Sequence, residues 1–328
     1  MLKGKIFKKY SSILQVFLLI IALLLLILNP KINMQSFLDG IILWAKFVMP
    51  ALFPILFLTS ILNFSGLTIK IGKIFSPITT KLFNCSGVAG YIYLMSILSG
   101  YPVGAKITSE LYEKNIISFA EASRITSFTS TSGPLFIIGT VGVGMFGSFK
   151  AGAIILISHI LGAAINGILF RNLYTKNCYN QAKSLNSTKQ DNILENSMLS
   201  TIKAVLIIGG YIALAYMIIS LFEHNNFFYL IDSYLCDIFQ FESGTISSIL
   251  QGFIEITKGC HSLGLSHLSI QLKTIIACGI ITLGGASIFL QAYTYLAKFR
   301  IKLKIYFLQK ILHTAISITI CSILVFIF

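Results

Sequence analysis

Long apolar segments separated by short polar stretches dominate the chain. Apolar runs of about 20 residues predict membrane-spanning helices, because the hydrocarbon core of a bilayer is about 30 Å thick. The pattern predicts apolar helices over residues 11–28, 37–64, 88–98, 128–146, 152–170, 201–221, 273–297 and 305–328. The run 88–98 is too short to cross a bilayer alone. The sequence therefore predicts an all-α polytopic membrane protein in which some helices are broken or re-entrant.

Matched interruptions lie in the two apolar halves of the chain. In the first half, Gly100 and Pro102 interrupt one apolar run, and Gly133 with Pro134 interrupts the next. In the second half, Gly252 and Gly259 flank one interruption, and Gly284-Gly285 forms the other. The same separation, 33 residues, divides Gly100 from Gly133 and Gly252 from Gly285. Because irregular backbone persists at membrane depth only where protein buries it or a cavity borders it, these interruptions indicate a central binding site in a transporter-like fold.

Composition agrees with a membrane protein. The chain has 328 residues, of which 55% are hydrophobic and 11% are charged, whereas soluble proteins carry about 25% charged residues. The net charge of +14 comes mainly from lysines at the ends of apolar segments, where they set orientation, so nucleic-acid binding is not expected. The six cysteines form no C-x-x-C pair and no metal-ligand spacing, so neither a metal nor another cofactor is expected.

Opposite charge bias at corresponding positions predicts two inverted-topology repeats. Residues 68–84 contain three lysines and no acid, whereas residues 223–243 contain four acids and neither Lys nor Arg. Positive charge marks the cytoplasmic side, so these segments are expected on opposite sides of the membrane. The predicted layout has a cytoplasmic N-terminus and an external C-terminus, with a signal-anchor-like span in 1–36, a first repeat in 37–170, a cytoplasmic linker in 171–200 and a second, inverted repeat in 201–328.

Glu255 is the strongest candidate for a functional carboxylate. It lies in an apolar stretch, and an intramembrane acid usually marks an ion or substrate path because burying its charge costs several kcal/mol. The alternative is a structural pair with Lys258, which lies three residues further along and can share one helical face. Both alternatives remain open from the sequence.

Hydroxyl groups and unusual polar residues complete the candidate site. A half-helix that begins near Pro134 would present its positive N-terminal end beside Ser132, although small residues here could equally serve helix packing. His159 is expected to bond across helices, and Lys106 is expected to extend to the interface. The predicted substrate-binding residues are Ser99, Gly100, Tyr101, Pro102, Ser130, Thr131, Ser132, Gly133, Glu255, Thr257, Lys258, Gly284, Gly285 and Gln291. The sequence has no nucleophile–base pair, so an enzyme is not expected.

Several of these motifs resemble one family. The segments Ser99-Gly100-Tyr101-Pro102-Val103-Gly104-Ala105-Lys106, Thr131-Ser132-Gly133-Pro134-Leu135-Phe136 and Gly252-Phe253-Ile254-Glu255-Ile256-Thr257-Lys258-Gly259 are similar to those of the sporulation integral membrane protein YlbJ family. That family carries a nucleoside-recognition, or Gate, domain. The resemblance implies a nucleoside-transporter-like fold and a role in spore cortex formation, in the mother-cell or forespore membrane.

Two hypotheses of function follow. In the first, the protein transports or gates a small polar solute through a site at the interruptions, within the lipid bilayer. In the second, it is a non-transporting membrane scaffold for spore envelope assembly, acting as a homo-oligomer or with spore-envelope partner proteins. The interruptions would tolerate conservative changes only in the second case.

Overall fold

The computed structural model describes residues 20, 23–24, 26–65, 67–174, 192–299 and 301–328. Most of the predicted span 11–28 and most of the predicted linker 171–200 lie outside these residues. Every regular element in the described ranges is helical, which confirms the all-α prediction. Four of these helices are long and apolar enough to cross a membrane, and the bent pair Lys70–Phe83 and Val88–Ser99 forms a fifth candidate span.

The first half begins with one long helical run and continues with shorter helices. Its elements are α2 (Pro30–Leu43), the wide π-type turn η1 (Trp44–Val48), α3 (Met49–Phe64), α4 (Leu67–Phe83), α5 (Gly87–Ser99), α6 (Val103–Glu113), α7 (Phe119–Ile125), the π-helical η2 (Leu135–Met145) and α8 (Phe149–Leu169). Pro30 occupies the first turn of α2, a position that needs no amide hydrogen. The run therefore begins before the predicted start at residue 37.

The second half has the same general order of long and short helices. Its elements are α9 (Ile193–His224), α10 (Phe227–Phe239), α11 (Thr245–Ile254), α12 (Ile256–Leu265), α13 (Ile270–Leu283), α14 (Gly285–Leu296), the short 3₁₀ turn η3 (Ala297–Phe299) and α15 (Leu303–Ile327). α9 begins inside the range predicted as linker. Its first turns are held by packing, because Ser197 is fully buried and Ser200 accepts a hydrogen bond from Lys106 Nζ at 2.6 Å.

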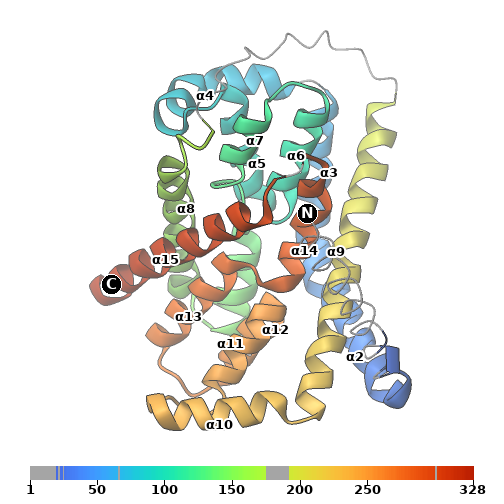
Figure 1. The fold of residues 1–328 in the computed structure, drawn as a ribbon, viewed down its shortest axis with the longest axis vertical. Coiled ribbons are helices and arrows are strands. Elements are labelled where there is room, and N and C mark those ends of the chain that lie inside the picture. Colours follow the sequence, from blue (N-terminus) through green and yellow to red (C-terminus); the bar gives the residue numbers. More distant parts are fainter. Residues whose placement is uncertain (1–19, 21–22, 25, 66, 175–191, 300) are drawn as a thin grey trace, which may run out of the picture.

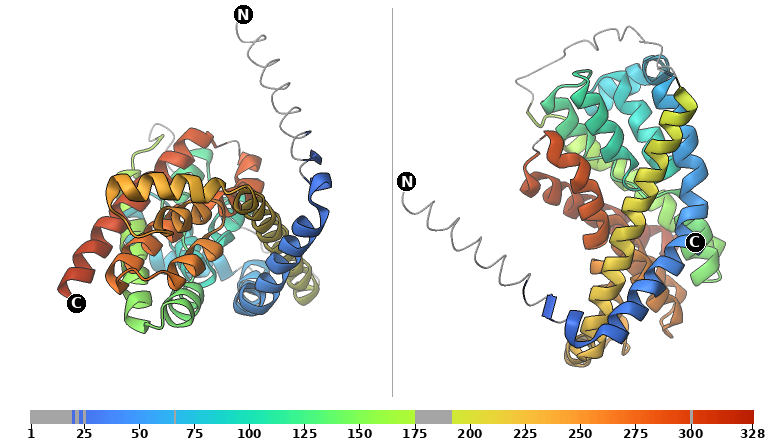
Figure 2. Two further views of the ribbon diagram at one scale, coloured as in Figure 1. Left: turned by 90° about the horizontal axis from the view of Figure 1, so that it is seen from below. Right: turned by 90° about the vertical axis from the view of Figure 1, so that its right-hand side faces the viewer.

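α4 and α10 lie at opposite ends of the molecule, at the top and bottom of Figure 1 and of the right-hand view in Figure 2. The segment Lys70–Phe83 of α4 turns by 94° into α5. α10 exposes aromatic side chains such as Tyr229 and Tyr234, while its Asp232 carboxylate is buried and accepts the backbone N–H groups of Gly244 and Ser247 at 2.7 and 2.8 Å. That carboxylate fixes the start of α11, because it satisfies amides at a helix N-terminus that have no partner within the helix.

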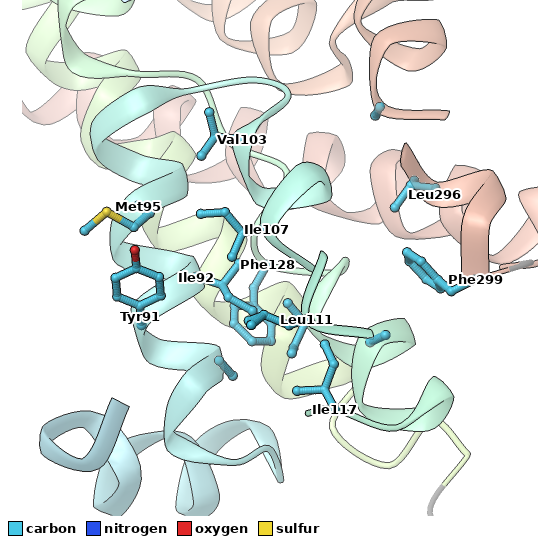
Figure 3. Packing of buried hydrophobic residues seen from close by; sticks show 14 of the residues in the cluster. Tyr91, Ile92, Met95, Val103, Ile107, Leu111, Ile117, Phe128, Leu296 and Phe299 are labelled. Atoms are coloured by element: carbon cyan, nitrogen blue, oxygen red, sulfur yellow. The ribbon is translucent and has the colours of Figure 1, made fainter. Parts of the chain in front are cut away.

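Two helical hairpins extend from these ends toward the middle. α5 and α6 form the first, and Figure 3 shows Ile92 of α5 beside Ile107 of α6 in the core cluster. Tyr91, Phe128 and Leu296 belong to the same cluster, so the hairpin packs against both halves. α11 and α12 form the second hairpin, in which Gly252 and Gly259 face each other so closely that a Cβ on Gly259 would lie 2.4 Å from Gly252 Cα. Both hairpin tips are thereby fixed near the centre.

Candidate functional site

All four predicted interruptions are present. Residues 100–102 separate α5 from α6, and residues 130–133 are irregular before η2 begins at Leu135. Glu255, with an extended backbone, separates α11 from α12, and Gly284 separates α13 from α14. Helix ends at these points leave backbone groups without partners inside the helices, so polar groups are concentrated in the middle of an apolar protein.

The interruptions touch each other within each half. Gly100, with φ +76°, packs so closely on the first-half break that a Cβ would lie 2.8 Å from Gly133 N. Gly285, with φ +61°, packs on the second hairpin, where a Cβ would lie 2.7 Å from the Gly252 carbonyl oxygen. Both positions combine a left-handed backbone with a close approach of another backbone, which favours glycine.

A cavity of about 60 Å³ lies between the two hairpin tips. The first tip contributes Gly100 and Tyr101, and the second contributes Glu255 and Thr257. The remaining lining residues come from both halves. They are Val48 and Leu52 of η1 and α3, Ser132 and Gly133 of the first-half break, Phe136 and Thr140 of η2, Ile208 and Ile212 of α9, Ile256 of the second tip, and Ile288 and Gln291 of α14. Half of the fourteen predicted site residues therefore line one cavity built from both halves.

The other seven predicted residues lie around this cavity without lining it. Pro102 and Ser130 border a smaller cavity of about 10 Å³, which also includes Tyr101. Ser99 is buried, and Thr131 Oγ1 donates to Ser96 Oγ at 3.1 Å. Gly284 and Gly285 shape the second break, and Lys258 lies on the first turn of α12. These seven residues therefore support the cavity wall from behind.

Glu255 is 1% exposed and caps α12. Its Oε2 accepts the Lys258 backbone N–H at 2.9 Å, and its Oε1 accepts the Thr257 hydroxyl at 3.1 Å. Both oxygens therefore have hydrogen-bond partners, and the carboxylate lies at the positive N-terminal end of α12. No described Lys, Arg or His forms an ion pair with it. The carboxylate is therefore a capping group that also lines the cavity, without an ion pair to a described basic side chain.

Lys258 does not pair with Glu255, so the alternative of a structural Glu255–Lys258 ion pair is wrong. Its Nζ lies 3.5 Å from Glu223 Oε1, and its side chain also approaches the ring of Tyr216. The helix break explains why Lys258 pairs with Glu223 and not with Glu255. The extended backbone of Glu255 turns its carboxylate back onto the α12 N-terminus, and the Lys258 side chain points toward the end of α9 instead.

We expect Lys258→Gln to have a small effect on stability. The ion pair with Glu223 is 28% and 38% exposed at its two side chains, and such pairs contribute at most about 1 kcal/mol. The backbone N–H that caps Glu255 is retained in the variant. The melting temperatures of the wild type, of Lys258→Gln and of the double variant Lys258→Gln with Glu223→Gln in detergent measure how much the ion pair contributes to stability. A loss well above 1 kcal/mol would show that the ammonium also stabilises the Glu255 charge.

Tyr101 connects the first hairpin tip to α13 and α15. Its hydroxyl lies 3.2 Å from the Ile281 carbonyl oxygen and 3.3 Å from that of Thr282. Lys310 Nζ donates to the Tyr101 hydroxyl at 2.9 Å and to Ser130 Oγ at 3.3 Å. The same ammonium lies 4.7 Å from the centre of the Tyr101 ring. The tip that one half contributes is thus anchored by polar groups of the other half.

His159 joins the two halves at a second point. Its Nε2 accepts the Ser132 backbone N–H at 2.9 Å, and its Nδ1 lies 2.9 Å from Thr282 Oγ1. Because Nε2 is an acceptor, a neutral imidazole carries its proton on Nδ1 and donates it to Thr282. His313 stacks on this ring at 4.9 Å, and its Nε2 donates to the His159 carbonyl oxygen. The prediction of a cross-helix histidine is confirmed.

Sequence reasoning missed two buried cations. Lys310, 4% exposed, lies in the last predicted span; a lysine followed three residues later by His313 inside an apolar run is itself a signal of function. Lys106 was expected to extend to the interface, and that expectation is wrong. It is 8% exposed and donates to Ser200 Oγ of α9.

The fold and this site define a polytopic α-helical membrane protein with a central cavity between broken helices. The chain is similar to the sporulation integral membrane protein YlbJ of Bacillus subtilis (strain 168), with 27% identity over 307 residues that cover 87% of this chain and 75% of that protein. This similarity supports membership in the YlbJ family, as the motifs predicted, and therefore a sporulation-associated integral membrane protein. No family model and no solved structure matches the chain.

Proposed function

We propose that this protein transports or gates a small polar solute during sporulation, in support of spore cortex formation. The observation that carries the proposal is the cavity at which both hairpin tips, the first-half break at Ser132 and Gly133, and a buried carboxylate converge. A scaffold would need no buried carboxylate beside a cavity between broken helices, and burying this group is costly. The cavity, at about 60 Å³, is smaller than the roughly 300–1,000 Å³ of ordinary ligand sites. We therefore interpret this conformation as a closed one.

We further infer that the two halves are inverted repeats of a Gate-type fold. Each half has, in order, a long helix, an amphipathic end helix, a hairpin with a polar tip, a broken helix and a final span. The two end helices, α4 and α10, lie at opposite ends of the molecule (Figure 1). α4 carries three lysines and α10 two aspartates, so the α4 end is proposed to face the cytoplasm. This arrangement would let one half move against the other around a fixed central site.

A panel of solutes tests the proposal. The purified protein would be melted in detergent with nucleosides, amino acids, sugars and cell-wall precursors. A ligand at about 100 times its dissociation constant adds roughly 2.7 kcal/mol of stability. Gln291, which is 2% exposed and lines the cavity, provides the test variant, because Gln291→Leu keeps the volume and removes the amide. Gln35 on α2 is exposed, so Gln35→Leu is the matched control.

The expected result is a stabilising solute whose effect is lost in Gln291→Leu and retained in Gln35→Leu. The same two variants would then be compared for sporulation in cells. If no solute stabilises the folded protein and Gln291→Leu sporulates normally, the transport proposal is wrong and the scaffold hypothesis replaces it.

A further inference from the structure

The cavity contains one negative charge that the surrounding protein does not balance. Glu255 is buried at the second hairpin tip, and within the described part of the chain its carboxylate has no cationic partner. Lys258, the nearest lysine along the chain, is paired with Glu223. Lys310 is directed to the hydroxyls of Tyr101 and Ser130. Two hydrogen bonds and the N-terminus of α12 offset only part of the cost of burying this charge, so a positive charge from outside the chain would stabilise it.

A bound proton is one way to neutralise the carboxylate, and a bound cation is the other. One oxygen accepts a backbone N–H and the other accepts the Thr257 hydroxyl. The backbone N–H is satisfied by either form, and the Thr257 hydroxyl can donate to an ionised Oε1 or accept the proton of a neutral one, so these two bonds suit both forms. The cavity beside the carboxylate, which further oxygen atoms border, is what favours a bound cation.

The other polar lining groups supply oxygen atoms. Ser132, Thr140, Thr257 and Gln291 border the same cavity as Glu255, and hydroxyl, amide and carboxylate oxygens are ligands of hard cations. The position is also suitable electrostatically. Glu255 lies between the C-terminal end of α11, where the helix dipole is negative, and the N-terminal end of α12, which its carboxylate caps. Broken helices in transporters coordinate cations with their C-terminal ends.

Size and charge limit the ligand. A cavity of about 60 Å³ has room for a few water molecules or a small ion with water, and not for an organic amine of the size of an amino acid. One carboxylate balances one positive charge. We propose that Glu255 and the oxygen groups around it form a binding site for a monovalent alkali cation of the size of sodium, with Thr257 holding the carboxylate in position.

This inference rests on the cavity of the proposed function, but its test uses ions alone, in the absence of any solute. The full-length protein in detergent would be melted in chloride salts of sodium, lithium, potassium and choline at equal ionic strength, and binding of radioactive ²²Na⁺ would be measured directly. We expect a saturable rise in melting temperature with sodium that choline does not reproduce. Glu255→Gln should weaken sodium binding by roughly tenfold or more, since one direct charge contact is lost.

Two controls separate this site from general effects of salt and from misfolding. Glu113 forms an exposed pair with Lys298 and does not line the cavity, so Glu113→Gln should keep the sodium response. If Glu255→Gln does not fold, Thr257→Val and Thr257→Ser replace it: Val removes the hydroxyl on the carboxylate and should weaken sodium binding, while Ser should retain it.

The outcomes distinguish the two proposals. Equal melting in sodium and choline, with no ²²Na⁺ bound, would overturn the cation site, and a response to pH alone would assign the counter-charge to a proton. Either result leaves solute binding to be judged by its own panel. Sodium binding that depends on Glu255, without any stabilising solute, would support the cation site and count against transport.

Discussion

Replacement of Gly285 by alanine is expected to lower the free energy of unfolding by about 2–5 kcal/mol, from a left-handed backbone penalty of roughly 1–2 kcal/mol and an overpacking cost of about 1–3 kcal/mol. The glycine has φ +61°, and a Cβ there would lie 2.7 Å from the Gly252 carbonyl oxygen. A backbone oxygen at the tip of a packed hairpin cannot move aside as a flexible side chain can. The second break and the hairpin would be forced apart, which also enlarges or distorts the cavity wall.

Gly147 offers a closely matched control for this effect. It has φ +63°, and nothing lies within 4 Å of the Cβ that an alanine would add. Gly147→Ala should therefore show only the backbone penalty of roughly 1–2 kcal/mol. Melting temperatures of both variants and the wild type in one detergent measure the difference. Equal destabilisation by the two substitutions would mean that the contact between Gly285 and the hairpin contributes nothing to stability.

The interruptions were predictable because they depend on local chemistry. Glycine and proline weaken helices, so residues 100–102 and 284–285 could be identified from the sequence as interruptions, and the helices end at both places in the structure. Glu255 was identifiable for a similar reason, since an acid in an apolar run is conspicuous. The amphipathic ends and apolar spans likewise follow from composition alone.

The pairing between these elements could not be predicted, because it depends on contacts between distant parts of the chain. Lys310 lies 209 residues from Tyr101, to which it donates, and Lys258 pairs with Glu223 across a hairpin and a helix end. The start of α9 at Ile193 was also missed. Its first turns are polar in sequence, and burial of Ser197 against the first half holds them helical.

His159→Leu is expected to destabilise the protein by about 2–6 kcal/mol, since each of two buried polar groups left without a partner costs roughly 1–3 kcal/mol. The imidazole now satisfies the Ser132 backbone N–H and Thr282 Oγ1, which belong to different halves of the chain. Leucine fills much of the volume but bonds to neither. The junction of the two breaks beside the cavity would loosen, so solute binding should weaken together with stability.

His159→Gln distinguishes hydrogen bonding from packing in this experiment. An amide can accept the Ser132 N–H through its oxygen and donate to Thr282 through its nitrogen, so the glutamine variant should recover part of the loss in melting temperature. His261 on α12 is exposed, and His261→Leu should leave the melting temperature near that of the wild type. If Leu and Gln at position 159 destabilise equally, the bridge would not be the source of stability, and the stacking of His159 on His313 would be the interaction that holds the two breaks together.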